Sequence, residues 1–310
     1  MQGLTELLFR KTYEECFPHL FDYAVSPFLS LTHNRPKEVL KNYVDVDVAA
    51  NEGAMPLEPQ LLGKEADEFA ALANVLYETG YPLVNWNIGC PVRQVAAKHR
   101  GSGILPYPDE VAQFLAQVVP QLRGQLSVKM RLGYYSPTEI QALIPILNHF
   151  PLQSVCIHPR IGKQLYGGSV DLDALSGVLH RFVHRIIYSG DIFAPEDYAA
   201  LRRRFPTIQE FMLGRGVLMR PTLPLEIRRL EQHEPPLPAA ERRALSVRFI
   251  HRLIEAIETQ ITSEHARMRK LKEYWNLLSV SVVDEATMRR AALRQPDYAS
   301  TLSVILSQIA

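Results

Sequence analysis

The sequence predicts an α/β protein in which a (β/α)8 barrel, or TIM barrel, is followed by an all-helical domain. Apolar stretches typical of strands alternate with stretches whose apolar residues recur at helical spacing, and this alternation indicates parallel βα units. Polar residues and glycines gather where the strands end, which is where such barrels carry their sites. Only seven strands can be counted, so the first of the eight is expected to be missing or truncated.

The expected strands follow one another at fairly even intervals. They cover residues 21–31, 54–63, 83–89, 126–133, 154–160, 185–192 and 210–218. Helical stripes separate the strands, because apolar residues repeat there at positions i, i+3, i+4 and i+7. These stripes cover residues 69–76, 111–118 and 140–147, and further helical segments are expected near residues 171–182 and 195–205. Residues 32–53 show no clear period.

A cluster of prolines marks the end of the barrel. Positions 221, 224, 235, 236 and 238 are all proline, and proline interrupts both helices and strands. No strand-like stretch follows them, whereas apolar residues at helical spacing continue to the end of the sequence. We therefore place the barrel domain at residues 1–234 and the helical domain at residues 235–310.

The composition is that of a folded protein of the cytoplasm. With 310 residues, 47% of them hydrophobic and 22% charged, the chain can bury a large core. It contains no run of about 18 apolar residues and no secretory signal, so we expect a soluble, cytoplasmic protein that binds no membrane. The net charge of +1 argues against a nucleic-acid binder that relies on overall positive charge, so any RNA must be bound by local patches.

The three cysteines, Cys16, Cys90 and Cys156, are odd in number and far apart. This spacing excludes a disulfide framework and a CxxC metal site, so each is interpreted as a single thiol and no bound metal is expected. Cys16 lies among apolar residues and is expected in the core, while Cys156 is expected in the barrel interior.

Residues 83–105 form the most informative stretch of the sequence. A strand that places Asn87 and Gly89 on one face is broken by Pro91, which leaves Cys90 at the corner between strand and loop. A thiol at such a corner can reach a ligand, and its unperturbed pKa of about 8.5 keeps it mainly protonated at neutral pH. The alternative is a small apolar corner residue. The loop that follows suits a mobile lid over an anion, because it carries Arg93, Lys98, Arg100 and a flexible Gly-Ser-Gly.

The alternation within residues 126–133 directs Lys129 and Arg131 to one face, which in a barrel is the mouth. A buried cation needs an anionic partner. That partner is either an anionic ligand or an internal carboxylate such as Glu58 or Asp47.

The ends of the last three strands add candidate ligand contacts. His158, followed by Pro159 and Arg160, is either a ligand contact or a satisfied structural histidine. Ser189-Gly190-Asp191 and Gly214-Arg215-Gly216 end the last two strands, where barrels often bind phosphate through backbone amides. Either could be an ordinary turn, but two in succession favour a phosphate site. No GxGxxG follows a strand, so a nicotinamide nucleotide is expected only as a visiting reductant.

The stretch Asn87-Ile88-Gly89-Cys90-Pro91, followed by Val95, Gly101-Ser102-Gly103 and Leu105, resembles the signature of the tRNA-dihydrouridine synthases. These are flavin enzymes that reduce uridine in folded tRNA. The resemblance covers residues 1–278 and is strongest between residues 60 and 215, where the Lys-x-Arg-x-Gly at 129–133 also fits.

Three departures from the family pattern stand out. Pro159 replaces the usual glycine, Ser189 replaces the usual asparagine, and the strand that should precede the first loop is absent, although Met1, Gly3 and Thr5 fit that loop. We therefore expect either that the natural chain starts upstream of Met1 or that another segment fills the gap.

The resemblance implies an FMN-binding barrel, a helical domain that forms a basic cleft for tRNA with it, and NADPH as the reductant. It implies that hydride reaches C6 of the uracil ring while the Cys90 thiol protonates C5. The implied cofactor contacts are Met1, Gln60, Lys129, His158, Ser189, Gly190, Asp191, Gly214 and Arg215. The implied substrate contacts are Asn87, Arg131 and Arg160, with Arg93, Lys98 and Arg100 on the lid.

Further RNA contacts are expected from basic clusters, although charge runs are often only solvated faces. The clusters are Arg202, Arg203 and Arg204 in the barrel, and Arg267, Arg269 and Lys270 in the helical domain. Two other functions remain open at this point: a flavin barrel that reduces a free pyrimidine or enone, and a non-catalytic relative that binds RNA. We expect a monomer.

Overall fold

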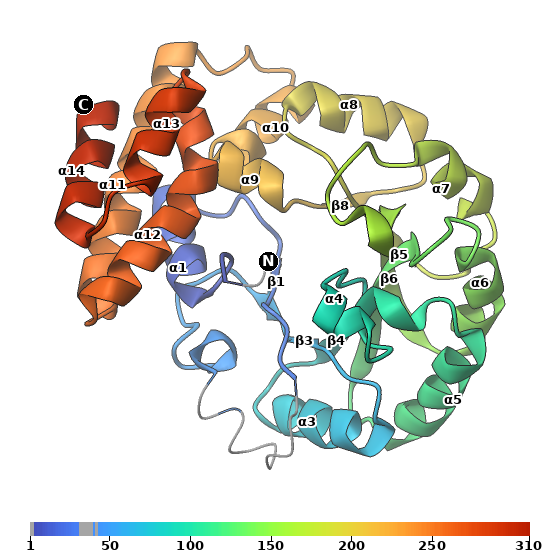
Figure 1. Ribbon diagram of the computed structural model, residues 1–310. Coiled ribbons are helices and arrows are strands. Elements are labelled where there is room, and N and C mark those ends of the chain that lie inside the picture. Colours follow the sequence, from blue (N-terminus) through green and yellow to red (C-terminus); the bar gives the residue numbers. More distant parts are fainter. Residues whose placement is uncertain (1–2, 31–39, 41–42) are drawn as a thin grey trace.

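The computed structural model describes residues 3–30, 40 and 43–310, and the statements below refer to these residues (Figure 1). Met1, a predicted cofactor contact, lies outside them. So do residues 31–39 and 41–42, which include the end of the first expected strand and part of the stretch that has no clear period.

A curved parallel sheet forms the barrel. Its main part runs in the order β3 (Gln60–Leu61), β4 (Leu83–Ile88), β5 (Gln125–Gly133), β6 (Leu152–Ile161), β7 (Ile186–Ser189) and β8 (Glu210–Met212). β1 (Ala24–Val25) pairs in parallel with β2 (Leu57–Glu58), and Leu29 bridges to Leu61 of β3. Only Pro59 separates β2 from β3, so these two strands together fill the one position expected over residues 54–63. The strands β1 to β8 therefore occupy the seven expected positions.

The barrel is open between β8 and β1. Among the described residues no strand pairs with the outer edge of either strand. One side-chain contact spans the opening, because the Tyr23 hydroxyl lies 3.4 Å from Oε2 of Glu210. Glu210 also pairs with Arg185 at 2.8 Å, so this carboxylate is held at the start of β8.

Several strands are shorter than the sequence predicts. The stretch 21–31 forms only β1 (Ala24–Val25) and the bridge at Leu29. Pro27 interrupts this stretch and Pro59 interrupts its partner stretch, and a proline has no N–H to donate to the ladder. The prediction of a strand over 210–218 is wrong beyond residue 212. There Gly214 breaks the strand and α9 (Arg215–Met219) begins.

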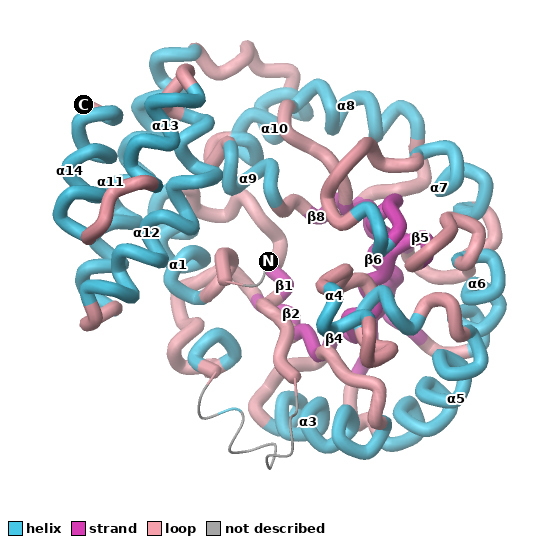
Figure 2. Tube along the Cα trace, in the orientation of Figure 1, coloured by secondary structure: helices cyan, strands magenta, loops and turns pink. Residues whose placement is uncertain are grey.

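Five helices cover the outside of the sheet, and Figure 2 shows the strands enclosed by helices. They are α3 (Ala66–Glu78), α5 (Pro108–Val118), α6 (Ile140–His149), α7 (Leu172–Leu179) and α8 (Pro195–Arg204). α5 illustrates how the sequence forms them: proline occupies its first position, Asp109 and Glu110 its first turn, and Phe114 belongs to its buried stripe. Trp86, on the outer face of β4, stacks on Phe114 at 4.2 Å and donates from Nε1 to the Gly63 carbonyl at 2.9 Å.

The C-terminal part is helical throughout. It contains α11 (Ala239–Gln260), α12 (Glu264–Leu278), α13 (Ala286–Leu293) and α14 (Tyr298–Ile309). The preceding helix α10 (Leu223–Glu231) packs against α8 and places Leu223 and Ile227 in the barrel core. The N-terminal helix α1 (Leu7–Cys16) packs against α11 and joins the core of this part (Figure 1). Phe249 of α11 contacts the rings of Phe9 and Tyr13, with centroids 5.6 and 5.7 Å away. One aromatic cluster therefore binds the two ends of the sequence together.

Short segments complete the structure. α4 (Arg93–Ala96) and the 3-10 helix Gly101–Ile104 form the loop after β4, and the 3-10 helix Gly162–Gln164 follows β6. Further 3-10 helices are Val44–Val46, Val119–Gln121 and Ser279–Ser281. Within the described ranges, every helix is too short or too polar to cross a membrane.

The aromatic cluster yields a stability test. Phe249 is fully buried, so Phe249→Ala leaves a cavity and is expected to lower the free energy of unfolding by about 3–5 kcal/mol. Leu306 is 38% exposed, and Leu306→Ala is expected to change it by no more than about 0.5 kcal/mol. Urea unfolding measures both. Equal losses would show that α1 and α11 are not held by this ring.

Candidate active site

The carboxyl ends of the strands bring the predicted polar residues to one mouth. Asn87 of β4 is in register with Lys129 of β5, and Arg131 of β5 is in register with His158 of β6. In-register residues of parallel strands point to the same face, so these four side chains share the barrel interior, as the alternation predicts. The neighbouring residues, such as Met130, point outwards into the apolar core.

A chain of buried amides crosses the barrel interior beneath this mouth. Gln60 donates from Nε2 to Oδ1 of Asn85 at 2.7 Å, and Asn87 donates from Nδ2 to Oε1 of Gln60 at 2.7 Å. Asn85 in turn donates to the Ser127 hydroxyl at 2.7 Å and to Glu58 at 3.3 Å. Ser127 also donates to Glu58, so the chain ends on a carboxylate. Burial raises the pKa of Glu58, and the bonds from Ser127 and Asn85 act in the opposite direction.

The two ends of this chain determine which way every amide points. At one end the backbone N–H groups of Gly89 and Cys90, which can only donate, meet Oδ1 of Asn87 at 3.0 and 2.9 Å. At the other end the Glu58 carboxyl accepts from Ser127 and Asn85. The NH2 groups of Asn87 and Gln60 therefore both point towards the Glu58 end of this hydrogen-bonded chain. Asn87 donates one N–H to Gln60, and Gln60 donates one N–H to Asn85. A second N–H on each amide is left to donate to a ligand.

Cys90 lies at the corner after β4, as predicted. The corner is held from both sides: Asn87 accepts its N–H, and the backbone and hydroxyl of Ser102 donate to its carbonyl at 2.9 and 3.0 Å. Gly101 lies so close that a Cβ there would come within 2.6 Å of the Cys90 carbonyl oxygen, and its φ of +54° favours glycine. Cys90 is partly exposed, and burial raises the pKa of its thiol, which keeps the proton on sulfur at neutral pH.

Two cations face the mouth without a carboxylate partner among the described residues. Arg131 is 1% exposed, and its guanidinium donates to the carbonyls of Gly89 at 3.1 Å and Ile161 at 2.8 Å and contacts the Tyr166 side chain. Burial lowers the pKa of Arg131 to about 10, so it stays charged. The side chain of Lys129, half-buried, makes no hydrogen bond or ion pair with any residue that the structure describes.

The internal partners that the sequence offered for Lys129 are engaged elsewhere. Glu58 accepts from Ser127 and Asn85, and Asp47 accepts from the backbone N–H of Ala50 at 2.8 Å. Neither carboxylate therefore pairs with Lys129.

His158 is buried and neutral. Burial lowers its pKa to about 2, and the charges of Lys129, Arg131, Arg160 and Arg215 act in the same direction. Its Nε2 lies 3.1 Å from Nη1 of Arg160, and because a guanidinium can only donate, Nε2 accepts. The proton of the neutral ring is therefore on Nδ1.

Arg160 spends all five of its N–H groups inside the protein. Besides His158, it donates to both carboxylate oxygens of Asp191 and to the carbonyls of Gly167 and Gly168, at 3.2 and 2.6 Å. It thus ties the loop after β6 to the end of β7. Its predicted contact with substrate would require one of these bonds to break.

Asp191 is shared with a second guanidinium. Arg215 donates to its Oδ1 at 2.6 Å, so the predicted residues at the ends of β7 and β8 lie together. The exposed Tyr166 ring lies 4.7 Å from the Arg215 guanidinium and 5.4 Å from that of Arg131. Gly190 packs on Tyr188, whose buried hydroxyl has no hydrogen-bond partner among the described residues. Ser189 and Gly214 are both partly exposed beside this cluster.

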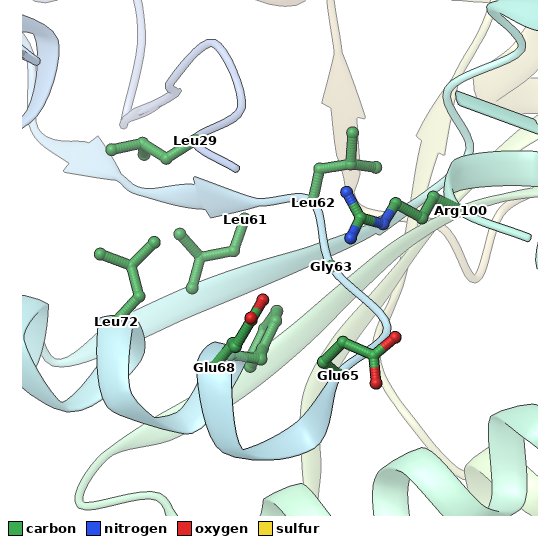
Figure 3. A pocket seen from close by; sticks show the side chains of 9 residues that line it. Leu29, Leu61, Leu62, Gly63, Glu65, Glu68, Leu72 and Arg100 are labelled. Carbon is green, nitrogen blue, oxygen red and sulfur yellow. The ribbon is translucent and has the colours of Figure 1, made fainter. Parts of the chain in front are cut away.

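The three basic residues of the lid do not act as one group. Arg93 and Lys98 are exposed, but Arg100 turns towards the start of α3. Figure 3 shows its guanidinium beside Leu62 and Gly63, in a small hollow that Glu65 also lines.

The predicted RNA clusters are also divided. In the helical part, Arg267 donates to the carbonyls of Ile261 and Glu258, and Lys270 pairs with Glu6 at 2.8 Å. In the barrel, Arg202 donates to the Ile208 carbonyl and Arg204 pairs with Asp173, while Arg203 is exposed. Arg269 instead lines an open groove on one face of α12, together with His265, Lys272, Glu273 and Asn276.

Sequence reasoning missed the full extent of the amide chain and the position of Tyr166. The spacing Glu58-x-Gln60 places both residues on one face of a strand, and this was the available signal for Glu58. Tyr166 gave no signal, because its place depends on the folded loop after β6. Among the described residues, no cluster of metal-ligating side chains is found.

Fold and site together define an α/β-barrel protein whose mouth combines a thiol corner with unneutralised cations. The chain belongs to the dihydrouridine synthase (Dus) family, whose family model matches residues 1–305. The tRNA-dihydrouridine synthase B of Escherichia coli (strain K12) is 29% identical over 198 residues, which are 63% of this chain and 61% of the relative. That of Proteus vulgaris is 30% identical over 199 residues, with the same shares.

The chain thus spans about three fifths of the length of these curated relatives. Among solved structures, a morphinone reductase is 12% identical, with a TM-score of 0.49, over 77% of this chain and 84% of that chain.

The glycine beside Cys90 allows a test of the corner. Gly101→Ala introduces a Cβ that the Cys90 carbonyl must avoid, at a φ that costs about 1–2 kcal/mol for other residues. We expect iodoacetamide to alkylate Cys90 roughly 5- to 30-fold faster in this variant, as followed by mass spectrometry of the three thiols. Gly177→Ala is the control, because a Cβ there meets no atom within 4 Å. Equal rates in both variants would contradict the description of a glycine-dependent corner.

The neutral His158 predicts a pH dependence of stability. In the unfolded chain a histidine binds a proton below a pKa of about 6.5, whereas folded His158 stays neutral to about pH 2. The unfolded state therefore binds more protons, and stability falls as the pH drops below 6.5, by up to about 1.4 kcal/mol per pH unit for this group. His158→Gln is expected to show a shallower loss between pH 6.5 and 4.5 in urea unfolding. His251→Gln, at an exposed position, is expected to leave the slope unchanged.

Proposed function

We propose that the chain reduces a uridine in tRNA to 5,6-dihydrouridine, with FMN as bound cofactor and NADPH as reductant. The observation that carries this proposal is the pair of cations, Lys129 and Arg131, that lack a carboxylate partner beside the Cys90 corner in a chain of this family. Its curated relatives are named tRNA-dihydrouridine synthase B, which supports tRNA as the substrate.

The residues at the mouth fit a flavin. A reduced flavin is electron-rich at N1 and O2, and Lys129 offers an unpaired ammonium to such atoms. Gln60 contributes an unspent amide N–H from within the barrel. We assign the flavin phosphate to the ends of β7 and β8, at Ser189, Gly190, Gly214 and Arg215. Asp191 and His158 are assigned as further contacts.

The remaining residues act on the substrate. When bound, FMN supplies the hydride that C6 of the uracil ring receives, and NADPH regenerates it. Cys90 then gives its proton to C5, a role that suits a thiol whose raised pKa keeps it protonated at neutral pH. Asn87 holds a uracil carbonyl through its second N–H, and Arg131 adds a charged donor near the same corner.

A uridine in folded tRNA must leave its stack to reach this mouth, at a cost of a few kcal/mol. Contacts to the RNA backbone offset that cost and orient the substrate. Arg93 and Lys98 on the lid are exposed for this role, and Arg269 on α12 is a further exposed basic side chain. Arg100, Arg160, Arg267 and Lys270 have internal surroundings, so we assign them no phosphate contact in this conformation.

The experiment is a comparison of Cys90→Ala with Cys16→Ala. Both variants are purified, their flavin absorbance is recorded, and dihydrouridine is mapped in tRNA from cells that lack the protein. Loss of a general acid is expected to lower turnover about 10²- to 10⁴-fold in Cys90→Ala, with flavin still bound. Cys16 lies in the helical core, so Cys16→Ala is expected to turn over like wild type.

The same assay separates the two alternative functions. Undiminished turnover in Cys90→Ala would reject the acid assignment. Turnover of free uracil or an enone without tRNA, insensitive to salt, would indicate a small-molecule reductase, because binding through phosphates weakens steeply with salt. A colourless protein that still binds tRNA would indicate a non-catalytic relative.

A further inference from the structure

A pair of tyrosines, one exposed and one half-buried, stands with an exposed lysine at the ends of β5 and β6. Tyr135 is 59% exposed and meets Tyr134 edge to face, with ring centroids 4.7 Å apart. The Lys163 ammonium lies 5.4 Å from the Tyr134 ring and 5.3 Å from the Tyr135 ring. We call these three residues the aromatic rim. The proposed reaction does not use them.

The aromatic rim is held rigidly although it is exposed. The Glu139 carboxylate accepts from the backbone N–H groups of Tyr134, Tyr135 and Ser136, at 2.7, 3.0 and 3.0 Å. Gly133 closes the turn, since a Cβ there would lie 2.0 Å from the Ser136 carbonyl oxygen. A side chain on such a preorganised turn loses little conformational freedom when it binds a partner.

The aromatic rim is continuous with the Cys90 corner. The backbone N–H of Lys163 donates to the Tyr134 carbonyl at 3.0 Å. The residue before it, Gly162, is wedged between the Tyr134 ring and the Ser102 hydroxyl, where a Cβ would come within 2.2 and 2.6 Å of them. Ser102 in turn donates to the Cys90 carbonyl. The aromatic rim therefore adjoins the Cys90 corner, and a chain molecule with one unit at Cys90 can place a neighbouring unit on the aromatic rim.

The chemistry of the aromatic rim matches a nucleotide. A nucleobase stacks on an exposed aromatic ring whatever its sequence, and a nearby ammonium attracts the phosphate that follows the base. A protein partner would need a much larger apolar surface than two tyrosine rings. In RNA whose uridine has been flipped out, the neighbouring base has lost a stacking partner, and a ring at this position replaces it.

We propose that the aromatic rim binds a nucleotide next to the reacting uridine in the RNA chain, with its base on Tyr135 and its phosphate near Lys163. This inference rests on the proposed function and names a contact of that function's RNA substrate. It gives a role to a surface at the mouth that lies outside the flavin and uracil contacts.

The test compares three variants with wild type. Tyr135→Ala removes the ring, Tyr135→Phe keeps the ring without the hydroxyl, and Val183→Ala changes an exposed residue just before β7, at the other end of the barrel. For each we measure flavin absorbance, tRNA affinity by fluorescence anisotropy, and kcat/KM for tRNA. Tyr135→Ala is expected to lower affinity and kcat/KM about 10- to 100-fold with unchanged flavin absorbance. Tyr135→Phe and Val183→Ala are expected to match wild type.

Lys163→Ala supplies an independent readout. Loss of one phosphate contact is expected to make the slope of log affinity against log salt shallower by about 0.7–0.9. An unchanged slope together with wild-type affinity in Tyr135→Ala would overturn the inference while leaving a wild-type tRNA reductase, and hence the proposed function, intact. Wild-type protein that binds no tRNA would overturn both. Wild-type protein that binds tRNA without reducing it would overturn the proposed reaction, and the affinities would still decide on the aromatic rim.

Discussion

The site depends on one carbonyl oxygen. Oδ1 of Asn87 receives the backbone N–H groups of both Gly89 and Cys90, and this double contact turns the chain out of β4 with the thiol at the mouth. Because that oxygen is committed, the amide nitrogen of Asn87 must point into the barrel, and Gln60 and Asn85 follow in the same direction. The donors offered to a ligand are thus a consequence of how a strand ends. Glu58 completes the arrangement by accepting at the far end.

Charge is unevenly distributed around the mouth. Asp191 is shared by Arg160 and Arg215, so one carboxylate serves two guanidinium groups. Lys129 and Arg131, by contrast, have no carboxylate partner among the described residues. Burial is the main reason why His158 stays neutral, and the surplus positive charge lowers its pKa further. A buried surplus of this kind is costly unless an anion enters, and this requirement is the physical reason for expecting an electron-rich cofactor there.

Much of this could be predicted from the sequence, because it follows from local rules. The period-2 alternation placed Lys129 and Arg131 inside, and Pro91 placed Cys90 at a corner. What could not be predicted depends on contacts between distant segments. Arg160 was expected to face a substrate, but it is enclosed by the Gly167-Gly168 turn and Asp191. Arg100 was expected on the lid surface, yet it turns towards α3.

The shared core of α1 and α11 has a consequence for dissecting the molecule. Cutting the chain at the proline-based boundary between residues 234 and 235 would separate Phe9 and Tyr13 from Phe249. Each fragment would then expose to water the aromatic rings that pack together in the intact chain. Neither fragment would then be a faithful stand-in for its portion of the intact chain. A chimera with a relative's helical part would have to exchange the first helix along with it, so the inheritance of the two segments is coupled although more than 200 residues separate them.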